Sequence, residues 1–179
     1  MSLKIEQVHK YFVGEVSGID LSDPLSKSEV TQIEEGMDQF GVLIFREQFL
    51  SDEEQVSYTK NFGELELHVG SNVLKGNERR LSLEFADVSN LDQDGEILKK
   101  GDRRRMFNLG NRLWHTDSSF RNIPSKFSIL SCRSTPKVGG NTEFSFMPAV
   151  YDELDEGTKQ EIADLITCLL YTSPSPRDL

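Results

Sequence analysis

His115 and Asp117 are separated by one residue in the segment WHTDSSF, and both side-chain types bind divalent metal ions. In an extended segment, residues i and i+2 point to the same side, so the imidazole and the carboxylate can bind one cation while Thr116 points away. Two histidines and one carboxylate leave open positions for a chelating cosubstrate and O₂, which suits non-haem Fe(II). The pair alone is explained more simply by a half-buried histidine hydrogen-bonded to a nearby aspartate.

Several other segments accompany this pair. Asn111 lies shortly before His115, and Thr142 lies downstream in GGNTEF. Nearer the N-terminus are VSGIDLSDPLS, GVLIFREQFLSDEEQ and FGELELH. Together, and with the spacing from His115 to Thr142, these segments resemble the TauD/TfdA-type family of Fe(II)- and 2-oxoglutarate-dependent dioxygenases. The resemblance runs from Val13 to about Ile166, and it is specific only because the motifs occur together.

The resemblance implies a role for each matching residue. His115 and Asp117 would be iron ligands, and Thr142 would hydrogen-bond the distal carboxylate of 2-oxoglutarate. A strand hydroxyl can orient an anion in an apolar pocket, although an ordinary strand threonine is the alternative. His68 and Asn111 match substrate-contacting positions of the taurine branch. The alternatives for these two are a solvated loop histidine and a turn asparagine.

The resemblance also implies the reaction and its cofactors. These are Fe(II), 2-oxoglutarate as cosubstrate and O₂, used to hydroxylate a small anionic organic substrate such as an aryloxyacetate, a sulfonate or another carboxylate. WHTDSSF and GGNTEF are similar to the aryloxyacetate branch. The segment LHVG lacks the proline and tyrosine that follow in the taurine enzyme, so the sequence departs from that branch.

The third iron ligand of the family is missing from the sequence, because no histidine follows Asp117. We therefore expect this chain, as given, to bind iron weakly and to be inactive. One alternative is a non-catalytic ligand-binding or interaction module on the same fold. Another is a different mononuclear metal enzyme, such as a hydrolase, against which the position of the GGNT segment argues.

Local signals in the first third of the chain predict two helices and two strands. Val13–Leu21 is β-prone and broken by glycines, which predicts a strand and a turn. Capping-box spacings at Ser26 and Ser51 predict helix starts, the first helix ending at Gly41 and the second near Phe62-Gly63. Val42–Phe45 is a short apolar strand.

The rest of the chain predicts further strands and a final helical pair. Alternation predicts strands at residues 81–85, 127–132 and 142–146, and Pro148 would begin helices that run to about Leu170. Residues 90–110 read as a polar loop. The predicted fold class is α+β, a partial double-stranded β-helix, or jelly roll, with flanking helices.

Composition limits location and partners. The net charge is −10 and the pI about 4.8, which disfavours a nucleic-acid partner. No apolar run approaches the roughly 20 residues of a membrane helix, and no secretory signal is evident, so we expect a cytoplasmic protein without a membrane partner. The basic residues between Lys99 and Arg105 read as a solvated loop, and His9 as a surface residue. A homo-oligomer is left open.

The domain organisation expected from the sequence is simple. Residues 1–170 would be the N-terminal portion of a single dioxygenase domain. Residues 171–179, YTSPSPRDL, contain two prolines and no apolar periodicity. We expect them to be a non-native or disordered tail.

Overall fold

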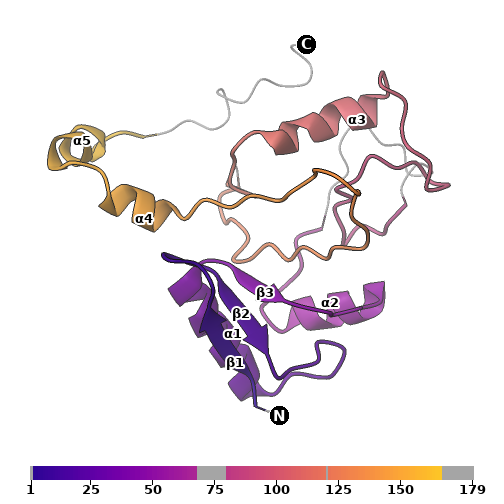
Figure 1. Ribbon diagram of the computed structural model, residues 1–179, viewed down its shortest axis with the longest axis horizontal. Coiled ribbons are helices and arrows are strands. Elements are labelled where there is room, and N and C mark those ends of the chain that lie inside the picture. Colours follow the sequence, from indigo (N-terminus) through magenta and orange to yellow (C-terminus); the bar gives the residue numbers. More distant parts are fainter. Residues whose placement is uncertain (1, 68–79, 120, 167–179) are drawn as a thin grey trace. The chain divides into compact units, whose positions relative to one another are not determined.

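The computed structural model describes residues 2–67, 80–119 and 121–166 (Figure 1). The described chain forms two compact units, which we treat separately. The first unit contains residues 2–63 and 129–166, and the second contains the described residues from 64 to 128. The single dioxygenase domain over residues 1–170 stays a prediction, and the tail lies outside the described residues. None of the helices formed by the described residues is long and apolar enough to cross a membrane.

A three-stranded sheet organises the first unit (Figure 1). Its strands are β1 (Lys4–Gln7), β2 (Gly14–Ser17) and β3 (Leu43–Phe45), in that spatial order. β1 and β2 are antiparallel, with Ile5 opposite Val16, whereas β2 and β3 are parallel. The predicted strands at β2 and β3 are confirmed. β1 was not predicted, because its four residues KIEQ show little apolar alternation.

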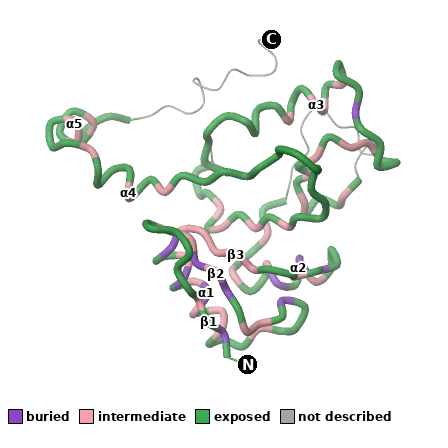
Figure 2. The backbone as a smooth tube through the Cα atoms, in the orientation of Figure 1, coloured by how far each residue is buried: buried purple, intermediate pink, exposed green. Residues whose placement is uncertain are grey.

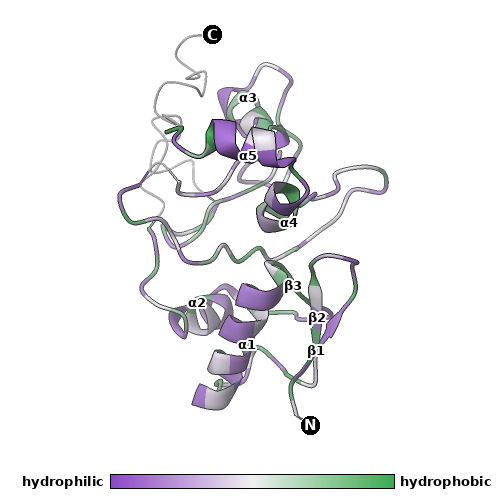
Figure 3. Cartoon of the chain, turned by 90° about the vertical axis from the view of Figure 1, so that its left-hand side faces the viewer, coloured by the Kyte–Doolittle hydropathy of each residue, from purple (hydrophilic) through white to green (hydrophobic). Residues whose placement is uncertain are grey.

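Helix α1 (Lys27–Phe40) supplies the crossover that joins the parallel strands β2 and β3. It begins at the predicted capping box: the Ser26 hydroxyl accepts from the Glu29 amide, and the Glu29 carboxylate accepts from the Ser26 amide. It ends at Gly41, whose φ of 66° is in the left-handed region that glycine adopts without strain. Both predicted ends of this helix are confirmed. Figure 3 shows hydrophilic and intermediate residues alternating along α1, in keeping with one buried face.

Helix α2 (Asp52–Lys60) begins at the second predicted capping box. The Ser51 hydroxyl accepts from the Glu54 amide at 3.2 Å, and the Glu54 carboxylate accepts from the Ser51 amide at 2.7 Å. The helix ends slightly before the predicted Phe62-Gly63. Three acidic residues in its first turn interact favourably with the positive end of the helix dipole.

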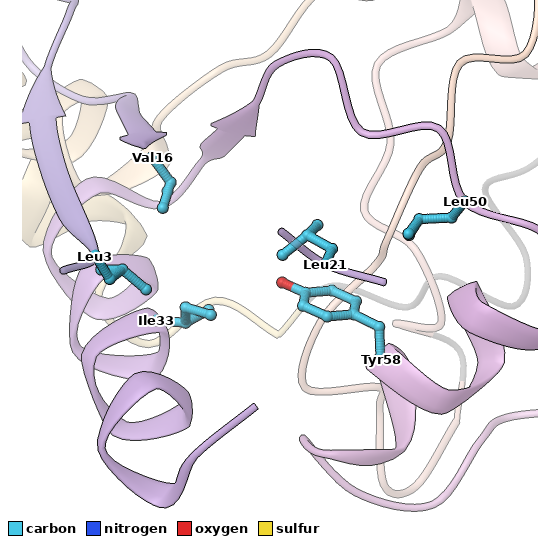
Figure 4. Packing of buried hydrophobic residues seen from close by; sticks show 6 residues of the cluster. All are labelled: Leu3, Val16, Leu21, Ile33, Leu50 and Tyr58. Atoms are coloured by element: carbon cyan, nitrogen blue, oxygen red, sulfur yellow. The ribbon is translucent and has the colours of Figure 1, made fainter. Parts of the chain in front are cut away.

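The hydrophobic core of the first unit lies between the sheet and these two helices. Figure 4 shows the six buried side chains converging, with the Tyr58 ring beside Leu21. Ile33 on α1 is only 3% exposed, and burial raises the pKa of the Tyr58 phenol. The buried cluster consists of Leu3, Val16, Leu21, Ile33, Leu50 and Tyr58.

Gly36 explains how closely α1 approaches the sheet. A Cβ atom at this position would lie 2.5 Å from the Ile5 Cδ1 atom and 3.3 Å from a Leu43 methyl group. Glycine is unfavourable inside a helix by roughly 1 kcal/mol relative to alanine. Its position in α1 therefore reflects packing against β1 and β3.

Two short helices lie in the C-terminal part of the first unit. They are α4 (Met147–Asp152), with Pro148 in its first turn, and α5 (Glu156–Ile162), capped by the Asp155 carboxylate. The predicted helical pair is confirmed here. The predicted extension to Leu170 is wrong at its start, because α5 ends at Ile162 and residues 163–166 form a turn and irregular chain. The rest of that extension lies outside the described residues.

The predicted strands outside β1–β3 are wrong for this structure. Residues 82–85 form a turn in which the Phe85 amide donates to the Ser82 carbonyl at 3.2 Å. Residues 127–132 and 142–146 pair with no strand among the described residues, and Leu130 and Phe144 are exposed. Alternation of apolar and polar residues predicts which side of a strand would be buried. A strand forms, however, only where a neighbouring strand satisfies its backbone hydrogen-bonding groups. The described residues form an α+β arrangement with one small sheet, and the partial jelly roll stays a prediction.

The second unit contains more helix than predicted and little core. Helix α3 (Arg103–Asn108) and the 3₁₀ helix η2 (Leu109–Arg112) lie where a polar loop was predicted. The start signal is Asp102, whose carboxylate accepts from the Arg104 amide. Among the described residues of this unit, Leu98 is the one buried hydrophobic side chain (Figure 2).

Candidate functional site

The His115–Asp117 segment lies in the second unit, directly after η2. It has no regular secondary structure, and a turn begins at Asp117. Ser118 has a φ of 55°, which is uncommon for a residue other than glycine. The chain therefore bends sharply immediately after the carboxylate.

The two side chains point to the same side, as their spacing predicts. The Nε2 atom of His115 lies 3.2 Å from the Oδ1 atom of Asp117, and the two side chains are 48% and 58% exposed. The Nδ1 atom of His115 lies 2.7 Å from the Leu113 carbonyl oxygen. The Ser128 hydroxyl donates to the other carboxylate oxygen, Oδ2 of Asp117, at 2.8 Å. One polar atom of each side chain is thus held by a hydrogen bond. The second polar atom of each faces the other side chain of the pair.

These contacts restrict the protonation of His115. A carbonyl oxygen only accepts, so the hydrogen bond to Leu113 assigns a proton to Nδ1. In a neutral imidazole the Nε2 lone pair then faces Asp117 Oδ1, which is also an acceptor. Two acceptors at this distance attract each other only through a cation between them. That cation is either a second proton on His115 or a metal ion.

The separation of these two atoms fits a shared metal ion. Two ligand atoms that each lie about 2.1 Å from an ion, at right angles, are about 3.0 Å apart. Metal-ligating histidines also donate the other ring nitrogen to a backbone carbonyl or carboxylate, which fixes the tautomer. Among the described residues, no group of three or more histidine, cysteine, aspartate or glutamate side chains could hold a metal. The described residues thus offer two ligands.

Of the other residues singled out from the sequence, one lies in the same unit as this pair. Asn111 lies in η2, in the same unit, and is exposed. Thr142 is exposed and belongs to the first unit. His68 lies outside the described residues. His9 is exposed, as predicted, with its ring 4.6 Å from that of Phe12.

Glu66 is a residue that sequence reasoning missed. Its Oε2 atom accepts from the Ser118 hydroxyl at 2.8 Å and from the Ser125 hydroxyl, and its Oε1 atom pairs with Arg121 Nε at 2.8 Å. The hydrogen bond from Ser125 contributes most to holding the pKa of Glu66 below its usual value, with Ser118 and Arg121 adding to the effect. Nothing in the sequence distinguishes Glu66 from its neighbour Glu64.

A family model described as "Taurine catabolism dioxygenase TauD, TfdA family" matches residues 4–173 of the chain. The match covers both units, and it includes the WHTDSSF and GGNTEF segments.

Two relatives illustrate the similarity. An alpha-ketoglutarate-dependent 2,4-dichlorophenoxyacetate dioxygenase from Burkholderia sp. (strain RASC) is 40% identical over 168 residues, covering 92% of this chain and 55% of the relative. An (S)-phenoxypropionate/alpha-ketoglutarate-dioxygenase from Sphingobium herbicidovorans is 30% identical over 152 residues, covering 84% and 47%. The chain thus spans about half the length of these relatives.

A solved structure shares the backbone arrangement. The crystal structure of AAD-2 in complex with Mn(II) and N-oxalylglycine is similar with a TM-score of 0.79 and 46% sequence identity. The alignment covers 92% of this chain and 54% of that chain.

Proposed function

The chain belongs to the taurine catabolism dioxygenase TauD, TfdA family, and from this premise we propose that the protein is an Fe(II)- and 2-oxoglutarate-dependent dioxygenase that hydroxylates a small anionic organic substrate. An aryloxyacetate-like substrate is favoured by the relatives, which are named for 2,4-dichlorophenoxyacetate and phenoxypropionate. The proposal includes the partial jelly roll as the fold. It also includes the wider class of substrates, which contains sulfonates and other carboxylates.

The observation that carries the proposal is that His115 Nε2 and Asp117 Oδ1 face each other at 3.2 Å. The protein holds the opposite atom of each group with Leu113 and Ser128, so both free atoms are directed toward one point. Such held, convergent ligands are the geometry that a metal ion requires. We assign these two atoms as metal ligands.

When bound, Fe(II) and 2-oxoglutarate would supply the oxidising chemistry: 2-oxoglutarate gives succinate and CO₂, one atom of O₂ enters succinate and the other enters the substrate. The chain's own contribution is to hold the ion with His115 and Asp117. Thr142 would orient the distal carboxylate of 2-oxoglutarate, and His68 and Asn111 would contact the substrate.

The two-ligand site limits what this chain does alone. The sequence contains no histidine after Asp117 to serve as a third ligand. We expect weak metal binding and no turnover from the chain as given.

Trp114 offers a direct test of metal binding, because it is the sole tryptophan of the chain and precedes His115. Cobalt(II) bound to His115 should quench its fluorescence in a saturable way. His115→Ala and Asp117→Ala should each abolish the saturable part. His9→Ala removes an exposed histidine of the first unit and should leave the titration unchanged. Equal quenching in all four proteins would contradict the metal site.

Measurement of succinate formation tests the expectation of inactivity. The chain is incubated with Fe(II), 2-oxoglutarate and a panel of aryloxyacetates and sulfonates. We expect no substrate-dependent succinate. Succinate formation would overturn the expected inactivity and support the dioxygenase directly. Binding of 2-oxoglutarate or an aryloxyacetate without succinate formation would favour a non-catalytic binding module.

A further inference from the structure

We propose that Glu66 is a positioning residue for the His115–Asp117 site, holding the turn that sets the direction of the Asp117 carboxylate. The inference rests on the proposed metal site and adds to it a residue that touches neither ligand in any contact described. Glu66 comes from a segment far from the ligands in sequence, FGELELH.

The contacts of Glu66 fix two points of the chain near the ligands. Ser118 directly follows Asp117, and its hydroxyl donates to Glu66 Oε2 at 2.8 Å. The Ser125 hydroxyl donates to the same oxygen, and the two hydroxyls are themselves 3.3 Å apart. Ser125 lies three residues before Ser128, which holds Oδ2 of Asp117. A single carboxylate thus links the residue after the ligand to the segment that orients the ligand.

The turn after Asp117 needs such a hold. A residue other than glycine in the left-handed region costs on the order of 1 kcal/mol and persists only where its surroundings fix it. Apolar packing provides little of this in the second unit, whose one buried hydrophobic side chain among the described residues is Leu98. Glu66 is about one-third exposed, at 31%, yet it engages three side chains. Polar contacts to Glu66 therefore replace packing as the support of Ser118.

The ion pair adds directionality to the two hydroxyl contacts. Arg121 Nε lies 2.8 Å from Glu66 Oε1, which leaves Oε2 for both serines. Charge-assisted hydrogen bonds are stronger than neutral ones, so Arg121 holds the carboxylate plane in place. The ion pair with Glu66 gives Arg121 a structural role in this turn. The proposal therefore does not need Arg121 to contact a substrate.

The test compares three substitutions in the full chain. Glu66→Ala removes all three contacts, Glu66→Gln keeps an oxygen that accepts from the serines, and Glu64→Ala removes a nearby exposed carboxylate. Outer contacts of metal ligands typically change affinity 10–100-fold. We expect about tenfold weaker cobalt(II) binding for Glu66→Ala by Trp114 quenching, a smaller loss for Glu66→Gln, and none for Glu64→Ala.

A spectroscopic readout separates positioning from general stabilisation. With cobalt(II) at saturation, Glu66→Ala should show an altered cobalt absorption spectrum, because Asp117 is no longer held in one orientation. An unchanged spectrum and an affinity equal to that of Glu64→Ala would overturn the positioning role while leaving the metal site intact. Absence of cobalt binding by the unsubstituted chain would instead overturn the metal site, and the role of Glu66 with it.

Discussion

The two units of the chain are held together by different kinds of contact. In the first unit, six buried side chains pack between a sheet and two capped helices. In the second unit, one described hydrophobic side chain is buried, and ion pairs such as Arg80–Asp87 and Arg121–Glu66 connect its segments. The candidate metal ligands, His115 and Asp117, lie in the second unit, which is held mainly by polar contacts.

This difference has a consequence for function. Apolar burial is worth about 25 cal/mol per Å² and needs no particular direction, whereas exposed ion pairs contribute only about 0–1 kcal/mol each. Polar contacts do, however, fix atoms in defined directions. We therefore expect the first unit to contribute most of the free energy of unfolding, whereas the polar contacts of the second unit orient a few side chains.

The strongest test of the comparison is Ile33→Ala in the core of the first unit. Removing a buried isoleucine side chain should lower the free energy of unfolding by about 2–5 kcal/mol, because a cavity remains. Denaturant unfolding followed by far-UV circular dichroism measures the change. The exposed Ile97 of the second unit gives the matched variant, and Ile97→Ala should change stability by less than about 0.5 kcal/mol. Equal losses would remove the distinction between the units.

A smaller effect is expected at the helix cap of α1. Ser26→Ala deletes the hydroxyl that accepts from the Glu29 amide, and a lost N-cap costs about 1 kcal/mol. Ser28→Ala, two residues further along the same helix, is the control. It removes one exposed hydrogen bond from the Gln32 side chain, and because alanine is the better helix former, stability should change little. Thermal unfolding of both variants measures the difference. A loss as large for Ser28 as for Ser26 would argue against the cap.

The smallest effect is expected on mild acidification. Hydrogen bonds lower the pKa of Glu29 in the first unit, chiefly from Ser26, and of Glu66 in the second, chiefly from Ser125. A carboxyl whose pKa is lower in the folded state stabilises the fold above its usual pKa of 4.5, and this contribution is lost as the pH falls through the folded value. Below pH 4.5, amide NMR signals around Ser118 and Ser125 should broaden before those of α1, whose core remains. Broadening of both sets of signals at the same pH would contradict the expected difference between the two units.

Local chemistry determined the parts of the fold that the sequence predicts correctly. The capping boxes at Ser26 and Ser51 and the glycine stop at Gly41 depend on contacts within a few residues, and the structure has all three. Helix α3 was missed, because its short run of basic residues resembles a solvated loop and its one start signal is Asp102. The strands expected at 127–132 and 142–146 failed, since pairing depends on a neighbour that alternation does not specify.

The sequence by itself determined the ligand pair, since the i and i+2 spacing of His115 and Asp117 places both side chains on one side of an extended segment. It also determined the family, through several motifs at matching positions. Only the tertiary structure decided which atoms are free to bind. The contacts of Ser128 and Glu66 join residues that lie far apart in the sequence, because a hydroxyl or carboxylate finds such a partner only after the chain has folded.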